Sequence, residues 1–269
     1  MKSVTNNEPD SLACIHSLWI GDRLSPIERL TALSFMRHGH KFVLYVYREV
    51  QDVPSGVELR DANKVIPLGE VFLSHGSYAH FSDWFRWKLL RMNGGVWVDM
   101  DVVCLRPIDL NIDIMFGFES VNLPNVSVLG FPAGHPVCEA MEDRCMNPNH
   151  VREGDSAREI IRKLGRRYLH GNQRGSVKWG EAGGPSGFKR VLDNHAMLKK
   201  GLPFTYFYPI HWTNAAAIFD DSLSQDIKMF SDTRCIHLWN DQLRKHGINK
   251  FGPFPKASLI NKLLYLNGV

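Results

Sequence analysis

Two aspartates separated by a single residue, Asp99 and Asp101, are the side chains of this sequence best suited to chemistry. They lie between two apolar runs, Val96–Val98 and Val102–Leu105, which indicates a covered position and not an exposed surface turn. A turn at the end of the first run would let both carboxylates converge on one point. A hard divalent cation is the natural occupant of such a point, and Mg²⁺ or Mn²⁺ keeps open positions for phosphate oxygens.

An acid and a guanidinium precede this pair on a predicted helix. Asp83 and Arg86 are three residues apart, so they are neighbours on one helix face. The predicted apolar stripe lies on another face and consists of Phe81, Phe85, Leu89 and Met92. One interpretation is a solvated ion pair of little energetic value. The other is that this face is covered, as Trp87 on it suggests, and that the pair binds sugar hydroxyls and phosphates.

These residues need elements to position them, and the sequence predicts an α/β sheet. The opening order is strand 12–20, a helix that begins with a capping box of Ser25 and Glu28 and ends near Gly39, and strand 41–47. A helix over 78–93 then stops at Gly94-Gly95, whose backbone could approach a ligand closely. Further strands are expected at 96–98, 102–105, 114–118, 126–131 and 234–239, and further helices at 136–146, 156–168, 188–199 and 256–266, with a glycine-rich loop at 170–187.

The composition sets the protein class. The chain has 269 residues, of which 44% are hydrophobic and 22% charged, so it can bury a core and is not disordered. No repeat or linker is visible, which predicts one domain over 1–269, with halves at 1–107 and 108–269. The net charge of +4 is too small to indicate nucleic-acid binding. No P-loop, Gly-x-Ser-x-Gly or dinucleotide motif is present, which disfavours ATPases, serine hydrolases and dehydrogenases.

The cellular location is predicted from the targeting and membrane-spanning features that the sequence lacks. No apolar run approaches the roughly 20 residues of a membrane-spanning helix, and the polar N-terminus, with Glu8 and Asp10, is unlike a signal peptide. The five cysteines form no Cys-x-x-Cys pair and indicate a reducing compartment. We therefore expect a cytoplasmic protein. The basic helix around Arg158 and Arg167 either faces solvent or makes a peripheral contact with the inner face of an anionic membrane.

Taken together, the motifs resemble a known family. Ser82-Asp83-x-x-Arg86, followed by Gly94-Gly95-x-aromatic-x-Asp99-x-Asp101, is similar to the signature of the DXD-containing glycosyltransferase sugar-binding region family. That family includes glycosyltransferase family 32, the α-1,4-glycosyltransferases of glycolipid synthesis and the glucosylating clostridial toxins. Weaker likeness appears at 15–21, at Gly184-Pro185 and at 236–240. The chain departs from the signature at Trp97, where a tyrosine is common.

The resemblance implies a GT-A fold, in which a Rossmann-like mixed central sheet is flanked by helices. It also implies a nucleotide-sugar donor, with UDP as the expected nucleotide, and a divalent metal, Mn²⁺ or Mg²⁺. Asp99, Asp101 and His237 would hold the metal, and Asp101, Arg86 and Asp83 would be the catalytic residues. The residues expected to bind the donor are His16, Trp19, Asp83, Arg86, Gly95, Trp97, Asp99, Gly184, Trp239 and Asn240. The acceptor would be a glycan, a glycolipid, or a lipopolysaccharide or capsule precursor.

Alternatives remain open at this stage. A metal-dependent nucleotidyltransferase or phosphotransferase would also use paired aspartates, and a non-catalytic nucleotide-sugar-binding protein would keep the same motifs. The family resemblance implies transfer with retention of the anomeric configuration. Inverting transfer would instead require a general base, for which Glu119 and Glu181 are the candidates.

Overall fold

The computed structural model describes residues 12–108, 113–221 and 230–269. The N-terminal segment with Glu8 and Asp10 lies outside the described residues. The strands are β1 (Ile15–Trp19), β2 (Phe42–Val46), β3 (Glu58–Asp61), β4 (Gly95–Val98), β5 (Val102–Cys104), β6 (Met115–Ser120), β7 (Leu123–Phe131) and β8 (Cys235–His237). The helices are α1 (Pro26–Arg37), α2 (Ala79–Asn93), α3 (Pro136–Met146), α4 (Ala157–Tyr168), α5 (Pro185–Asn194), α6 (Phe204–Phe207), α7 (Asn240–Lys245) and α8 (Leu259–Leu266).

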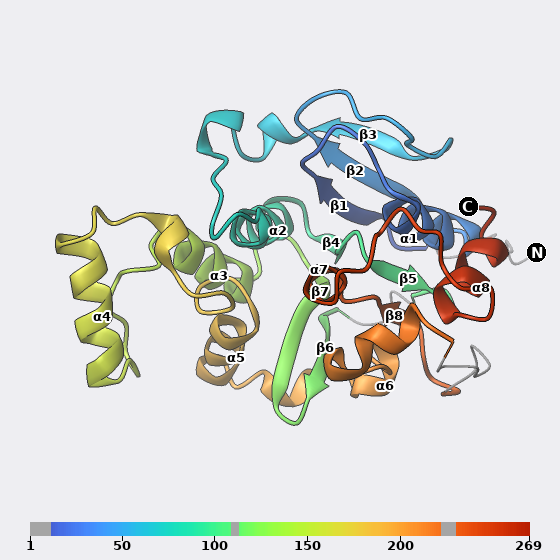
Figure 1. The fold of residues 1–269 in the computed structure, drawn as a ribbon. Coiled ribbons are helices and arrows are strands. Elements are labelled where there is room, and N and C mark those ends of the chain that lie inside the picture. The colour runs from blue at the N-terminus through green and yellow to red at the C-terminus, as the bar shows by residue number, and fades with distance from the viewer. Residues whose placement is uncertain (1–11, 109–112, 222–229) are drawn as a thin grey trace, which may run out of the picture.

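The centre of the molecule is a six-stranded mixed sheet in the order β3-β2-β1-β4-β7-β6 (Figure 1). Strands β1 to β4 are parallel, whereas β7 runs antiparallel to β4 and β6 antiparallel to β7. This confirms the expected α/β class with a mixed central sheet flanked by helices. The sheet also joins strands from both predicted halves of the chain, because β4 pairs directly with β7.

The two faces of the parallel strands belong to two separate apolar clusters. Ile15, Phe42 and Val96 are among the buried side chains that pack with α1, whereas Val43 and Trp97 pack with α2 on the other face. Successive side chains of a strand point to opposite faces, so a strand with both faces covered is apolar throughout. This explains why β2 and β4 show no polar alternation, unlike the largely exposed edge strand β3.

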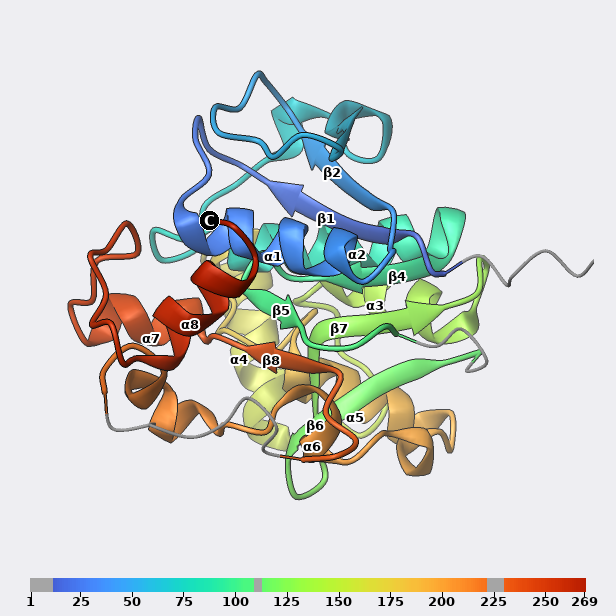
Figure 2. The same ribbon diagram turned by 90° about the vertical axis from the view of Figure 1, so that its right-hand side faces the viewer.

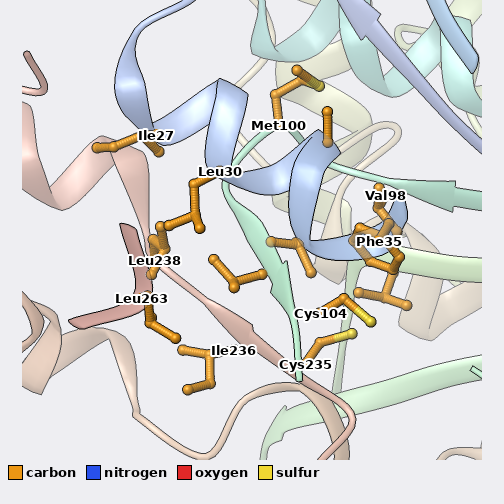
Figure 3. Close-up of a cluster of buried hydrophobic side chains, with 14 of the residues drawn as sticks. Ile27, Leu30, Phe35, Val98, Met100, Cys104, Cys235, Ile236, Leu238 and Leu263 are labelled. Atoms are coloured by element: carbon orange, nitrogen blue, oxygen red, sulfur yellow. The ribbon is translucent and has the colours of Figure 1, made fainter. Parts of the chain in front are cut away.

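A short ribbon beside the sheet completes the first cluster. Strands β5 and β8 pair antiparallel to each other and form a separate two-stranded sheet (Figure 2). Ile236 of this ribbon belongs to the same buried cluster as Leu30 of α1 and Leu263 of α8 (Figure 3). Met100 belongs to the same buried cluster (Figure 3). The ribbon is therefore held firmly by core packing, although each of its strands is only three residues long.

Most predicted elements form, and the differences have local causes. Helix α1 begins with the expected capping box, in which Ser25 and Glu28 satisfy each other's backbone N–H groups. The helix predicted at 188–199 begins earlier and ends earlier, at Pro185 and Asn194, because Pro185 occupies the first helical position. The six-residue helix α7 was not predicted. Met92, assigned to the apolar stripe of α2, is exposed at the end of that helix.

Helix α2 is buried on nearly every side. Phe81 and Phe85 are fully buried, as the stripe predicts, but Asp83, Arg86 and Trp87 on the other face are buried as well. Helix α3 packs along α2 and covers part of this second face. The acid and the guanidinium are therefore enclosed, which excludes the solvated ion pair. None of the helices in the described ranges combines the length and apolar character that a bilayer crossing requires.

Candidate metal and sugar-donor site

The turn after β4 presents the two aspartates. The backbone N–H of Asp99 still donates to Ser127 of β7 at 2.9 Å, and the carbonyl of Asp99 accepts from Val102 at 3.1 Å, which closes the turn. Met100 between them is only 7% exposed because its side chain enters the α1 cluster. With Met100 anchored in the core, the flanking carboxylates are left on the other side of the turn.

The β5–β8 ribbon brings a histidine to these carboxylates. Val102 is paired with His237, and the backbone N–H of Leu238 donates to the carbonyl of Asp101 at 2.8 Å. As a result, Nε2 of His237 lies 3.3 Å from Oδ1 of Asp101. One potential ligand atom from each of Asp99, Asp101 and His237 lies within 4.8 Å of the other two.

The donor set of this cluster fits a divalent cation. Two carboxylates and an imidazole suit Mn²⁺, which accepts oxygen and nitrogen ligands together. Nδ1 of His237 is buried and has no hydrogen-bond partner among the described residues. Oδ2 of Asp101 is oriented by the backbone N–H of Asn240 at 2.7 Å. Trp239, in the left-handed region with φ 57°, packs its ring 4.1 Å from that of His237. These contacts fix the orientation of the potential ligands without satisfying all of their polar atoms.

The electrostatics of the cluster show an excess of buried negative charge. Burial raises the pKa of Asp99, and Asp101 beside it raises that pKa further. Burial also opposes ionisation of Asp101, but His237 and the Asn240 N–H outweigh it and lower the Asp101 pKa. Without a cation, a protonated imidazole would thus be the counter-charge of Asp101; a divalent cation bound by the neutral imidazole would take over that role.

Arg86 connects this cluster to Asp83. Its guanidinium lies 3.1 Å from Oδ1 of Asp83 and 3.2 Å from Oδ1 of Asp99, and it also donates to the carbonyl of Val126. Arg86 further lies over the ring of Trp97, 5.3 Å from its centre. The indole N–H of Trp97 donates to Asp99 at 2.8 Å. Each group that faces Arg86 therefore also holds it in one orientation.

Asp83 keeps one oxygen without a partner. Its Oδ2 is buried and accepts no hydrogen bond from the described residues. Burial raises the pKa of Asp83 to about 7, and Asp99 adds to this rise while Arg86 opposes it. The backbone of Gly183 and Gly184 forms the adjacent wall, because a Cβ on Gly184 would lie 3.4 Å from Oδ2. The free oxygen is thus available to a hydroxyl donor of a bound ligand.

Two of the predicted donor-binding residues, His16 and Gly95, lie away from the two carboxylates, whereas Trp19 ends β1 at the same edge of the parallel sheet as Asp99. His16 is the second residue of β1, opposite Trp97, and a Cβ on Gly95 would lie 3.1 Å from its Nε2. Gly95 begins β4, whereas Asp99 follows its last residue, so His16 and Gly95 lie at the other end of the strand. His16 is buried, which lowers its pKa to about 4. Trp19 is the last residue of β1, and Nζ of Lys250 lies over its ring, 4.9 Å from the ring centre.

The structure adds residues that the motifs did not indicate. Tyr208 lies beside His237, with ring centres 6.0 Å apart, and its hydroxyl accepts from Ser127 at 3.3 Å. Trp87 donates to the carbonyl of Gly183 at 2.7 Å and so fixes the wall next to Asp83. Only Trp87 had a signal in the sequence, its place on the helix face of Asp83 and Arg86. Tyr208 had none.

Comparisons with known proteins match different parts of the chain. Residues 178–261 match the model of the alpha-1,4-glycosyltransferase conserved region, and residues 68–123 match that of a capsular polysaccharide synthesis protein. The first match includes His237 and the second includes Asp99 and Asp101. A 74-residue stretch, 25% of this chain, is 31% identical to an uncharacterized glycosyltransferase of Acanthamoeba polyphaga mimivirus and spans 30% of that protein's length.

Solved structures with partial likeness are also glycosyltransferases. The PaToxG glycosyltransferase is 14% identical with a TM-score of 0.47, covering 69% of this chain and 70% of that one. The UDP-bound glycosyltransferase domain of the YGT toxin is 9% identical with a TM-score of 0.49, covering 72% and 79%. The family-model matches confirm the resemblance read from the motifs: the chain is similar to α-1,4-glycosyltransferases over the segment that carries His237.

Proposed function

We propose that this protein is a metal-dependent glycosyltransferase of the GT-A type, which transfers a sugar from a nucleotide-diphosphate sugar, with a UDP-sugar as the donor to test first. The observation that carries the proposal is the convergence of Asp99, Asp101 and His237 beside the enclosed Asp83–Arg86 pair. A metal cluster alone would suit many reactions. A buried guanidinium next to a carboxylate with a free oxygen adds groups that suit a phosphate and a sugar hydroxyl.

Each of these residues has a separate task in the proposed reaction. Asp99, Asp101 and His237 would hold Mn²⁺ or Mg²⁺, which when bound neutralises charge on the departing nucleoside diphosphate. Arg86, already fixed by two carboxylates and the Val126 carbonyl, would support the same charge without reorganising. Oδ2 of Asp83 would accept a hydrogen bond from a donor-sugar hydroxyl. Gly184, Trp97, Trp239 and Asn240 would shape the site around these groups.

Transfer with retention agrees with the surroundings of the two candidate bases. Glu181 is paired with Arg162 and Arg166, at 3.0 and 2.8 Å, which hold its carboxylate in place. Glu119 is buried and accepts from the side-chain amide of Asn125 at 2.5 Å. In a retaining reaction the anomeric C–O bond to the diphosphate breaks and the acceptor oxygen bonds on the same face. The acceptor proton passes to a donor phosphate oxygen, so no protein base is required.

The acceptor and the location are further parts of the proposal. The match to a capsular polysaccharide synthesis protein supports a glycan, glycolipid, lipopolysaccharide or capsule precursor as acceptor. We propose a cytoplasmic enzyme that can contact the inner face of a membrane peripherally. Exposed basic and apolar side chains on α4, among them Arg158, Arg167, Ile161 and Tyr168, support that contact.

A screen of nucleotide sugars tests the proposal without knowledge of the acceptor. The full chain is incubated with each donor and Mn²⁺, and release of nucleoside diphosphate and free sugar is measured with and without excess EDTA. Metal-dependent release of both products supports a glycosyltransferase. Release of pyrophosphate would instead favour nucleotidyl transfer, and metal-dependent binding without any turnover would favour a non-catalytic binding protein.

A further inference from the structure

A second cavity lies away from the metal cluster, among helices α3, α4 and α5, which occupy one end of the molecule (Figure 1). Its volume is about 270 Å³, and it is lined by residues of these three helices, of the connection between α3 and α4, and of the segment 178–182. None of Asp99, Asp101 and His237 contributes to its wall. The cavity is therefore separate from the proposed metal site.

The wall of this cavity is strongly basic. Its cationic side chains are Arg144, Arg152, Arg162, Lys163, Lys178 and Arg190, against two lining carboxylates, Glu159 and Glu181. Four of the cations have acidic partners: Arg152 binds Asp143, Lys163 and Arg190 bind Asp155, and Arg162 binds Glu181.

The other two cations, Arg144 and Lys178, have no carboxylate partner within the part of the chain that the structure describes. Lys178 is exposed, so water solvates its ammonium group. Arg144 is different, because the rest of the protein covers it. The wall therefore contains a buried cation, Arg144, whose charge no carboxylate of the described residues balances.

The unpaired Arg144 is buried, with only 8% of its surface exposed. Among the residues that the structure describes, Arg144 makes one hydrogen bond, from Nη2 to the backbone carbonyl of Glu181 at 3.3 Å, and its Nε has no acceptor. Nε of Arg162 in the same wall also lacks an acceptor. Burial lowers the pKa of Arg144, and the nearby Arg152 and Arg190 lower it further. A buried guanidinium without an anion is costly, and an anion in the cavity would remove that cost.

The rim and the size of the cavity indicate what carries the anion. Trp179 lines the cavity but is 66% exposed, so its ring offers a flat surface to a ligand that enters. Sugar rings stack on such surfaces through their C–H faces. The cavity is larger than one inorganic phosphate ion would fill. Pro148 and Ala182 line both this cavity and the small pocket that contains Asp83, so the two sites are adjacent.

We propose that this cavity binds an anionic sugar, with Arg144 and Lys178 holding its carboxylate or phosphate group and Trp179 stacking on its ring. We further assign this sugar to the acceptor, because the cavity adjoins the Asp83 pocket and the donor's own phosphates are accounted for at the metal cluster. The assignment to the acceptor rests on the proposed glycosyl transfer. The binding of an anionic sugar does not.

Calorimetric titration of the full chain with small probes tests the binding directly. The probes are glucuronic acid, glucose 6-phosphate, neutral glucose and inorganic phosphate, and tryptophan fluorescence is recorded for wild type and Trp179→Phe. We expect one of the two anionic sugars to bind and to change the fluorescence of wild type only. Comparison of the two identifies whether the site takes a carboxylate or a phosphate.

Variants connect the binding to the cavity. Lys178→Ala should weaken binding of that sugar by about 3- to 10-fold, as expected for one partly exposed charge-assisted contact. Lys199→Ala, which removes another exposed lysine outside the cavity, should leave it unchanged. Arg144→Gln should weaken binding more than Lys178→Ala, and its thermal unfolding is measured alongside so that a loss of fold is recognised. Lys178→Glu provides a second strong variant at an exposed position.

Several results would overturn the inference. If glucose binds as tightly as the anionic sugars, Arg144 does not recognise an anionic group. If inorganic phosphate binds as tightly as glucose 6-phosphate, the sugar ring does not contribute to binding. The absence of any binding, or binding that Lys178→Glu does not alter, would also overturn the inference. Capture of the protein by phosphatidylglycerol vesicles, sensitive to Lys178→Glu, without soluble sugar binding would assign the surface to a membrane. Metal-dependent UDP binding, measured in parallel, tests the proposed function independently.

Discussion

The carboxylate of Asp101 and the imidazole of His237 lie 3.3 Å apart because Val102, next to Asp101, is paired with His237 across the β5–β8 ribbon. The ribbon extends one step further through the hydrogen bond from Leu238 to the Asp101 carbonyl. Buried side chains anchor both strands, including Cys104 and Cys235, which face each other in this register (Figure 3). The position of the histidine is thus determined by strand pairing and core packing, and a ligand is not needed to assemble the cluster.

Replacing Asp101 by Asn should abolish metal-dependent activity. The change keeps the shape of the side chain and its acceptor for the Asn240 N–H, but it removes the charge that would hold the cation. Loss of metal stabilisation amounts to several kcal/mol, so we expect turnover to fall by about 100-fold or more. Nucleoside diphosphate release and Mn²⁺-dependent UDP binding measure the effect.

Asp241→Asn is the matched control, since Asp241 is an exposed aspartate on α7 that pairs with Arg244 and Lys245. It should bind UDP and turn over like wild type. Normal turnover of wild type in excess EDTA would contradict the metal prediction, whatever the behaviour of the variants.

Replacing Asp83 by Asn should weaken donor binding while the protein stays folded. The variant would lose the charge-assisted contacts of the carboxylate to Arg86 and to the ligand, a loss of about 1.5–3 kcal/mol in the free energy of donor binding. Calorimetry with UDP-sugar against UDP alone locates the effect, because Asp83 is proposed to bind the sugar. Equal losses for both ligands would show that Asp83 acts on the nucleotide instead.

Arg86→Lys should impair both stability and activity. An ammonium cannot reproduce the planar fork that contacts Asp83, Asp99 and the Val126 carbonyl together. Because these groups are buried, we expect a loss of about 3 kcal/mol in the free energy of unfolding, measured by chemical denaturation. Wild-type stability together with wild-type kcat/KM would show that the pair has neither role.

A pair of glycine substitutions tests the wall beside Asp83. A Cβ at Gly183 would lie 2.5 Å from Sγ of Cys145 and 2.7 Å from Cβ of Asp83, so the wall must shift. Gly183→Ala should cost about 1–3 kcal/mol of stability and lower donor affinity. Gly165 on α4 has nothing within 4 Å of its Cβ position, so Gly165→Ala should stabilise by about 0.5–1 kcal/mol. Thermal unfolding and UDP-sugar titration of both variants provide the comparison.

The sequence predicted those parts of the site that local rules determine. The capping box of α1, the glycine stop after α2 and the turn that joins Asp99 to Asp101 each depend on a few neighbouring residues, and each is present. Trp87, on the helix face of Asp83 and Arg86, also indicated correctly that this face is covered. Local propensity and hydrophobic period are therefore reliable guides to the elements that carry the motifs.

Other features depend on long-range pairing that a single sequence does not contain. The antiparallel placement of β7 beside β4 decides that the carbonyl of Val126 faces Arg86, and no motif indicated it. The family resemblance implied that His16 binds the donor, and its strand was predicted correctly, but its side chain lies beside Gly95. The pairing of Glu181 with Arg162 and Arg166, which leaves Arg144 without an acid, also follows from the packing of α4 against the loop before α5.

The stereochemistry of transfer can be decided by removing the two carboxylates that could act as a base. Glu181 is held by two arginines, which lower its pKa, and it lines the basic cavity, so Glu181→Gln should leave the anomeric outcome unchanged. Glu119 is the sharper test because it is electrostatically coupled to His237 of the metal cluster. Burial raises the pKa of Glu119, and His237 opposes this rise only in part. Retention requires no proton acceptor from either, so Glu119→Gln should keep measurable turnover and give an α-linked product from an α-configured donor. Proton NMR of the fresh product reads the anomeric coupling directly. A β-linked product from wild type, with turnover lost in Glu119→Gln and kept in Glu181→Gln, would make Glu119 the base of an inverting enzyme.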